Sequence, residues 1–178
     1  YVERAGYLRD FQRQTPSLYP GFVENLSTVG TEEYDGIHYG KSGYVQFANY
    51  LANKVLRDIY GRVPAKQIDF PNIRYAYYTP SKDSVVLEFQ KGQNLDYNMS
   101  RDLGSYTRWL QEFFYFTDNS LENGYNQYNS NVIAGVATQN KVTLKLKGPQ
   151  DFKFITYLPA TFSDIYSNFY NGPHLSNS

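Results

Sequence analysis

The hydrophobic and polar positions of the chain follow a helical period between residues 43 and 60. The apolar side chains of this segment recur every three to four positions and form one stripe: Tyr44, Phe47, Ala48, Leu51, Val55 and Ile59. This spacing predicts an amphipathic helix over 43–60 whose stripe needs an apolar surface to cover it. Ser42 is the expected N-cap, and Gly61 with Pro64 is expected to end the helix.

Beyond Pro71 the period of the pattern changes from 3.6 to 2, which is typical of strands. Val85, Leu87 and Phe89 alternate with mostly polar neighbours, for example. The candidate strands are 73–79, 85–90, 108–117, 132–138, 141–147 and 152–158. Gln139-Asn140 lies between two of them and predicts a tight hairpin. Six short strands separated by turn residues predict an antiparallel β-sandwich.

The change of pattern divides the 178 residues into two predicted parts. Residues 1–63 hold the helix, and residues 64–178 hold the strands. The first part also contains a polar loop or short helix around residues 3–14 and a short apolar stretch at 22–29. Because the chain starts at Tyr1 rather than Met, we expect it to be a fragment of a longer protein.

Composition excludes several classes of partner. Lysine and arginine together number 17, as do aspartate and glutamate, so we expect no nucleic-acid partner, which would require clustered cationic side chains. No apolar run approaches the roughly 20 residues that a spanning helix needs, so we expect no membrane span. The chain has no cysteine, and 136 positions separate His38 from His174, so we expect no metal site. The 19 tyrosines and 12 phenylalanines suit a β-rich secreted domain.

One short motif carries chemistry, Asp35-Gly36-Ile37-His38, directly before the predicted helix. The carboxylate of an aspartate three residues before a histidine can fold back and accept the proton of one imidazole nitrogen. The other nitrogen is then directed outward as a base, which gives two thirds of a Ser-His-Asp triad. Gly36 and Gly40 relieve the steric limits of so tight a turn. The same four-residue pattern also arises by chance, and a histidine at a helix start can serve capping or packing instead.

The surroundings of this motif favour the catalytic interpretation. The run 35–51 contains the motif, the helix start at 41–44 and the inward apolar positions that follow, and it resembles the final conserved block of the SGNH (GDSL-like) hydrolases. In that family this block supplies the catalytic aspartate and histidine. The resemblance places these two roles at Asp35 and His38.

The resemblance also implies a fold. The segment 25–29 is similar to the last strand of the SGNH fold, so the match covers about residues 20–60. One helix and one short strand cannot form a stable α/β core alone. We therefore expect residues 1–63 to be the C-terminal part of an SGNH-type α/β sandwich, an α/β remnant whose N-terminal part is missing. Residues 64–178 are expected to form an antiparallel β-sandwich accessory domain.

The end of the chain resembles a second feature of such enzymes. Tyr170-Asn171-Gly172-Pro173 with Leu175 and Asn177 is similar to the closing stretch of carbohydrate esterases related to sialate O-acetylesterases. An aromatic residue often stands in that family where this chain has His174, so we expect His174 to be a surface loop residue. The family's serine lies in an upstream Gly-Asp-Ser block that is not visible here. Gly104-Ser105 is the only Gly-Ser pair and has no strand-to-helix elbow around it, so we assign no nucleophile.

The resemblance implies a secreted or periplasmic carbohydrate esterase that hydrolyses O-acyl esters on sugars, with O-acetyl as the expected group. His38 would take the proton of the absent serine and return it to the leaving sugar hydroxyl, while Asp35 would hold His38. No cofactor is needed. The implied partners are an acylated carbohydrate substrate and the missing N-terminal part of the same hydrolase domain. We expect the isolated chain to be inactive.

Two other classes remain open. In the first, the β region is a non-catalytic carbohydrate-binding or structural β-sandwich module, and the pattern at 35–38 is incidental. In the second, the helix face of an interaction protein docks on a partner. The aromatic run 113–116 with Trp109 could stack on sugar rings, although core packing is the expected role, because consecutive aromatic residues on a strand face both ways.

Overall fold

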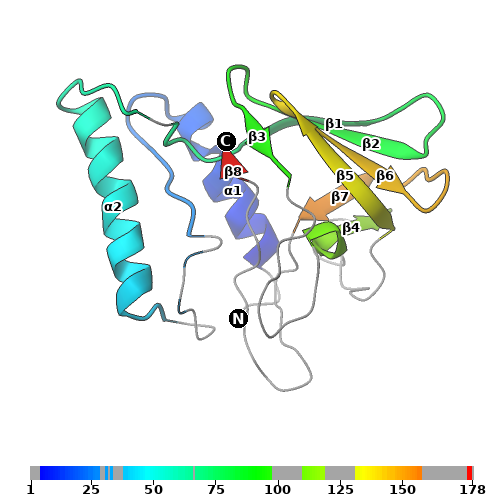
Figure 1. Ribbon diagram of the computed structural model, residues 1–178, viewed down its shortest axis with the longest axis horizontal. Coiled ribbons are helices and arrows are strands. Elements are labelled where there is room, and N and C mark those ends of the chain that lie inside the picture. Colours follow the sequence, from blue (N-terminus) through cyan, green and yellow to red (C-terminus); the bar gives the residue numbers. More distant parts are fainter. Residues whose placement is uncertain are drawn as a thin grey trace.

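The computed structural model describes residues 5–28, 31, 33, 38–65, 67–97, 110–118, 131–157 and 176–177. In these residues two helices precede a set of antiparallel strands (Figure 1). The helices are α1 (Ala5–Leu18) and α2 (Lys41–Asp58), and a short 3-10 helix, η2, spans Leu110–Phe113. The strands are β1 (Ile73–Tyr78), β2 (Ser84–Phe89), β3 (Leu95–Asp96), β4 (Phe114–Thr117), β5 (Val132–Thr138), β6 (Lys141–Leu146), β7 (Phe154–Tyr157) and β8 (Ser176–Asn177). The chain after α2 is therefore β-rich, as its period-two pattern predicts.

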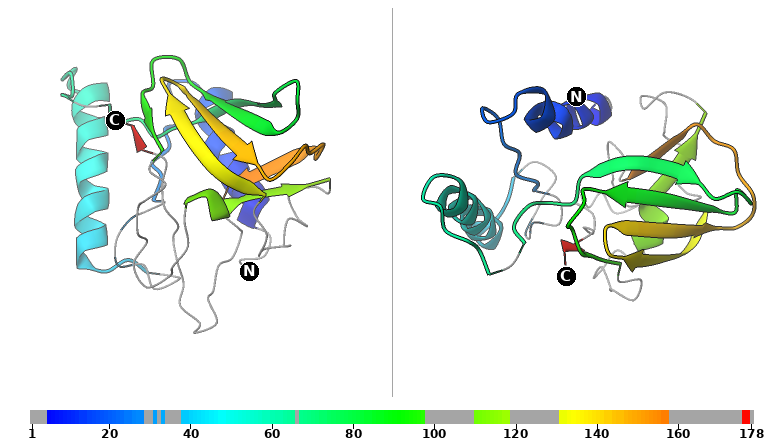
Figure 2. Two further views of the ribbon diagram at one scale, coloured as in Figure 1. Left: turned by 45° about the vertical axis from the view of Figure 1, so that its right-hand side comes forward. Right: turned by 90° about the horizontal axis from the view of Figure 1, so that it is seen from above.

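A four-stranded antiparallel sheet with the order β1-β2-β6-β5 is the largest sheet of the described chain (Figures 1 and 2). Its β5–β6 hairpin turns at Gln139-Asn140, as predicted, and Gln139 has the positive φ of 53° that tight hairpins often require. Strands β4 and β7 form a second antiparallel pair, and β3 and β8 form a third. The two predicted strands that alternate most clearly, β2 and β6, are neighbours in the main sheet.

One face of the main sheet is buried and forms the core. This face carries Val85, Leu87, Phe89, Val142, Leu144 and Leu146, all 3% exposed or less. The predicted alternation of inward and outward positions in β2 and β6 is thereby confirmed. Phe114 of β4 and Tyr157 of β7, whose ring centroids lie 4.9 Å apart, pack against this core. The β4–β7 pair thus covers the buried face as a second layer.

Two details of the strand prediction are wrong. The strand predicted over 108–117 begins only at Phe114, because residues 110–113 form η2. A 3-10 turn brings positions i and i+3 to one side, and Leu110 and Phe113 are both buried there. Strands β3 and β8 were not predicted, because a strand of two residues has no detectable period.

Helix α2 confirms the predicted helix, displaced by two residues towards the N-terminus. Its N-cap is Gly40 rather than Ser42, because the cap interaction comes from the preceding loop, where Glu33 Oε2 accepts the N–H of Ser42 at 3.0 Å. A carboxylate also suits the positive end of the helix dipole. At the other end Gly61, with φ 65°, reverses the chain and donates its N–H to the carbonyl of Arg57 at 3.1 Å, which confirms the predicted stop.

Polar side chains attach α2 to the segments that flank it in sequence. The buried Lys54 lies 3.0 Å from Glu24 Oε2 and 3.2 Å from Asp69 Oδ1. Arg57 donates to Asp69 Oδ2 at 2.5 Å. Burial on its own would raise the pKa of Asp69, but the hydrogen bonds from Arg57 and Lys54 outweigh it and hold that pKa below its usual value. Ion pairs of Lys54 and Arg57 therefore attach α2 to these flanking segments.

Helix α1 lies where a short helix or loop was expected and extends to Leu18. Arg13 of α1 donates to Asn72 Oδ1 at 2.8 Å and to the carbonyl oxygen of Ile73 at 3.2 Å. Ile73 is the first residue of β1, so Arg13 joins α1 to the edge of the main sheet.

The strand expected at residues 25–29 is not formed where the structure describes this segment, at 25–28. A strand needs a neighbour for its N–H and C=O groups, and the described chain places no parallel strand beside it. Asn25 instead contacts α1, accepting a hydrogen bond from Thr15 Oγ1 at 3.3 Å and donating one to the carbonyl of Gln12. The SGNH-type α/β arrangement thus remains a proposal.

Candidate functional site

The loop that carries the predicted catalytic pair is closed at its base by two hydrogen bonds. The N–H of Gly40 donates to the carbonyl oxygen of Glu33 at 2.8 Å, and the N–H of Ser42 donates to Glu33 Oε2 at 3.0 Å. Glu33 therefore joins the start of the loop to the first turn of α2, and we call these two bonds the Glu33 clasp. His38 lies within the closed loop, is exposed, and precedes α2 by three positions.

Gly40 allows the side chain of Glu33 to approach the first turn of α2. A Cβ atom at position 40 would collide with the side chain of Glu33, so only glycine allows the carboxylate to reach the helix start. Glu33 itself has φ 54°, a left-handed conformation that residues with a side chain rarely adopt. The clasp stabilises that conformation, since both of its hydrogen bonds end on Glu33.

The structure describes one of the two predicted catalytic residues. Asp35 lies outside the described residues, so its contact with His38 stays a prediction. Gly104-Ser105 and His174 also lie outside them. Glu33 was missed by sequence reasoning, because it lies well before the predicted helix start at 43, whereas capping signals are sought next to a helix start and in its first turn.

The apolar stripe of α2 is exposed along most of its length. Tyr44, Leu51 and Ile59 are 58%, 48% and 72% exposed, and within α2 only Gly43 and Lys54 are buried. Figures 1 and 2 show α2 standing apart from the strands. Within the part of the chain that the structure describes, the stripe therefore lacks the cover that its amphipathic pattern requires.

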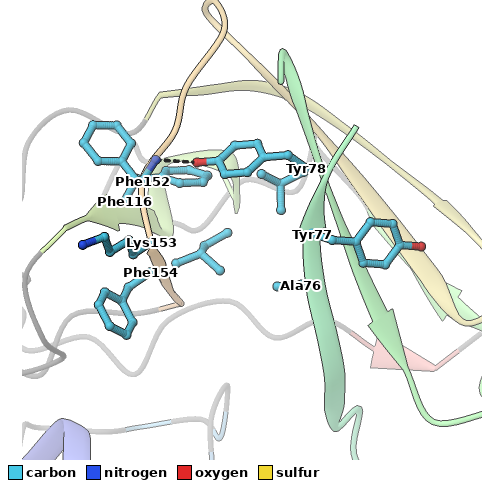
Figure 3. A pocket seen from close by; sticks show the side chains of 9 residues that line it. Ala76, Tyr77, Tyr78, Phe116, Phe152, Lys153 and Phe154 are labelled. Atoms are coloured by element: carbon cyan, nitrogen blue, oxygen red, sulfur yellow. Dashed lines mark hydrogen bonds between the residues drawn. The ribbon is translucent and has the colours of Figure 1, made fainter. Parts of the chain in front are cut away.

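A pocket of about 130 Å³ lies in the β-rich part, between β1 and β7 (Figure 3). Its lining is mainly aromatic and aliphatic: Ala76, Tyr77, Tyr78, Val85, Phe116, Phe152, Lys153, Phe154 and Ile155. The hydroxyl of Tyr78 accepts the N–H of Phe152 at 3.1 Å, and burial raises the pKa of Tyr78. None of these nine residues belongs to the loop of His38 or to α2, so the pocket is separate from the candidate catalytic site.

The aromatic run weighed as a sugar platform belongs mainly to the core. Phe113 and Phe114 are fully buried, and Tyr115 is buried as well. Phe116 packs against the core cluster, while Trp109 lies outside the described residues. For the described members of the run, the expectation of core packing is confirmed.

Two tyrosines that sequence reasoning did not single out are exposed instead. Tyr75 and Tyr77 of β1 are 66% and 43% exposed. Their cross-strand partners on β2 are Glu88 and Val86, which alternate with the buried positions of that strand. Tyr77 is among the residues that line the pocket, but Figure 3 shows its ring extending from the other side of β1. The period of two between these tyrosines was the signal that could have placed both rings on one outward face.

Two kinds of site are absent from the described residues. No group of three or more histidine, cysteine, aspartate or glutamate side chains there could hold a metal ion. The helices described there also include none that is long and apolar enough to cross a membrane.

Comparisons with family models, with curated proteins and with solved structures find no match for this chain. The resemblance to SGNH hydrolases therefore rests on residues 20–60 and on the closing stretch of the sequence alone.

Proposed function

We propose that this chain is the C-terminal portion of an SGNH-type carbohydrate esterase that hydrolyses O-acyl esters on sugars, with O-acetyl as the main acyl group. It supplies His38 and Asp35 of a Ser-His-Asp triad, and the serine belongs to the remaining part of the same hydrolase domain. One observation carries the proposal: an exposed histidine stands in a clasped loop three positions before a helix whose apolar stripe is uncovered.

The chemistry assigned to these residues is acyl transfer through a covalent intermediate. The serine hydroxyl attacks the acyl carbonyl, and one imidazole nitrogen of His38 takes the hydroxyl proton while Asp35 holds the other nitrogen. The bond between the acyl carbon and the sugar oxygen breaks, and His38 returns the proton to the leaving sugar hydroxyl. Water then attacks the acyl-serine with His38 again as base, which releases the acid and restores the serine.

The Glu33 clasp supports this role of the loop. A general base works only when it is held within hydrogen-bond reach of the proton it removes. By tying both ends of a short loop to the first turn of α2, Glu33 restricts the positions that His38 can take.

The uncovered stripe of α2 supports the proposal that the remaining part of the hydrolase domain packs on this chain and supplies the serine. In an α/β domain, a helix covers the sheet with its apolar face. The stripe of α2 is available for such a contact, whereas Lys54 and Arg57 already hold the helix to its flanking segments. The remaining part of the hydrolase domain would cover the stripe and bring its serine to His38. The acylated carbohydrate substrate and the secreted or periplasmic location follow from the resemblance alone.

The test is made on the native protein that contains this chain. Intact mass and N-terminal sequencing determine whether a Gly-Asp-Ser block precedes it, and acetate release from acetylated xylan and from p-nitrophenyl acetate measures the activity. We expect His38→Ala and Asp35→Asn each to lower kcat by about a thousandfold or more, because either change disables the triad.

His174→Ala is the matched control, since His174 is the other histidine of the chain, and it is expected to keep the kcat of the unmodified protein. The proposal fails if acetate release survives His38→Ala. It fails equally if the native polypeptide begins at Tyr1 and no serine is supplied by a partner.

A further inference from the structure

The outward face of the main sheet presents two exposed tyrosine rings beside each other. Tyr75 and Tyr77 are two positions apart in β1, so both side chains leave the sheet on the same face. Strand β1 is one of the two edge strands of the sheet, and Glu88 of β2 and Lys141 of β6 follow across the sheet in register with Tyr75. We call these four residues the tyrosine face.

Hydrogen bonds hold the ring of Tyr77 in one place. Its hydroxyl donates to Glu88 Oε2 at 3.2 Å and accepts from Lys141 Nζ at 3.2 Å, and Lys141 Nζ lies 2.9 Å from the same carboxylate oxygen. Because these partners stand on β2 and β6, the ring leans from the edge strand towards the middle of the sheet. Its hydroxyl is occupied by these two partners, and the residue as a whole is 43% exposed. The ring therefore offers a fixed apolar surface to solvent.

Two ion pairs lie on and beside this face. Glu88 pairs with Lys141, and Lys145 lies 2.6 Å from Asp83. Hydrogen bonding to Lys141 lowers the pKa of Glu88, and hydrogen bonding to Glu88 raises the pKa of Lys141, so both groups are ionised at neutral pH. A face of paired charges attracts neither polyanions nor polycations, yet its ionised groups still donate and accept hydrogen bonds.

We infer that the tyrosine face binds a neutral polysaccharide chain, with Tyr75 and Tyr77 stacking on sugar rings and the Glu88–Lys141 pair hydrogen-bonding to sugar hydroxyls. The C–H face of a sugar ring is apolar, and its hydroxyls lie around the rim. Exposed tyrosine rings bordered by an ion pair match both properties, because tyrosine is apolar in its body and polar at its tip. The inference shares no residue with the esterase proposal and does not rest on it.

Calorimetric titration of the chain with neutral β-1,4-linked hexasaccharides of xylose and of glucose tests this inference. We expect at least one of them to bind, and we expect Tyr75→Ala to weaken that binding by about tenfold. Tyr75→Phe keeps the ring and should keep most of the affinity. Tyr60→Ala is the matched control, because Tyr60 is as exposed as Tyr75 but lies beyond α2, and it should leave the affinity unchanged.

Several outcomes would overturn the inference. The inference is wrong if neither hexasaccharide binds, or if Tyr75→Ala and Tyr60→Ala weaken binding equally. A preference for polygalacturonate over the neutral chains at low salt would assign the face to an acidic ligand. Dimerisation in sedimentation velocity that Tyr75→Ala abolishes would assign it to a second copy of the chain. Hydrolysis of p-nitrophenyl acetate by the native protein should not change with Tyr75→Ala, so a failure here is distinguishable from a failure of the esterase proposal.

Discussion

Gly40 controls the approach of Glu33 to the first turn of α2, because the space of a Cβ atom at position 40 is filled by the glutamate side chain. We expect Gly40→Ala to displace Glu33, break the clasp and lower the free energy of unfolding by about 1 kcal/mol, the usual cost of a lost helix cap. Urea unfolding followed by circular dichroism measures this change. Gly148→Ala is the control, because a Cβ atom at Gly148 meets nothing within 4 Å and should cost much less.

A double-mutant cycle shows whether the cost of Gly40→Ala arises at the clasp. Glu33→Ala removes the same side-chain hydrogen bond, so the double variant should be no less stable than the worse single variant. Additive losses would mean that Gly40 and Glu33 act independently and that the clasp contributes nothing. Asp96→Ala, at an exposed carboxylate of β3, controls for the loss of one negative charge.

At the scale of elements, the sequence indicated which segments are helical or extended more reliably than it indicated what covers them. The period of 3.6 located α2 to within two residues, and the error at its start arose because the cap is a glutamate from the preceding loop rather than the serine beside the helix. A hydrophobic stripe specifies a face but not its partner. The exposure of Leu51 and Ile59 could therefore not be read from the pattern.

Acid should loosen the attachment of α2. The hydrogen bonds from Arg57 and Lys54 hold the pKa of Asp69 below its usual value, so the stability that they contribute is complete above the ordinary carboxyl pKa of about 4 and is lost as pH falls through the lower folded value. We expect the free energy of unfolding to decline below about pH 4, as measured by urea titrations between pH 7 and pH 2.

Asp69→Asn should remove part of that decline and lower stability at neutral pH. Asp96→Asn, at an exposed carboxylate of β3, is the control for the loss of one negative charge. An identical profile for Asp69→Asn and the unmodified chain would show that the ion pairs of Lys54 and Arg57 do not stabilise α2.

At the scale of the whole molecule, the described chain has a β-rich part with a buried core and a helical part without one. Period two predicted which residues of β2 and β6 are inside, because a half-buried strand must alternate. It did not distinguish buried aromatic residues from exposed ones: Phe113 and Phe114 are core, whereas Tyr75 and Tyr77 face solvent. That difference depends on which face of β1 and of its sheet the β4–β7 pair covers.

The uncovered stripe gives a prediction for the chain as a whole. Because Leu51 is 48% exposed, Leu51→Asp should change the free energy of unfolding of the isolated chain by no more than about 0.5 kcal/mol and should reduce its binding of a hydrophobic dye. Urea unfolding and dye fluorescence measure the two effects. A loss of several kcal/mol would mean that the stripe is already covered within this chain, which would contradict the proposal that the rest of a hydrolase domain covers it.

The hydrogen bond from Arg13 to the carbonyl oxygen of Ile73 affects whether a strand of another molecule can add to the edge of the main sheet. An edge strand with unoccupied main-chain groups is a template on which another molecule can add a strand, and repeated addition leads to fibrils. Arg13 takes one of these groups at the beginning of the edge strand β1, and its second bond, to Asn72, keeps α1 beside it. Arg13 thereby occupies one main-chain acceptor at this edge, and we expect removal of α1 to leave that acceptor open to a strand of another molecule.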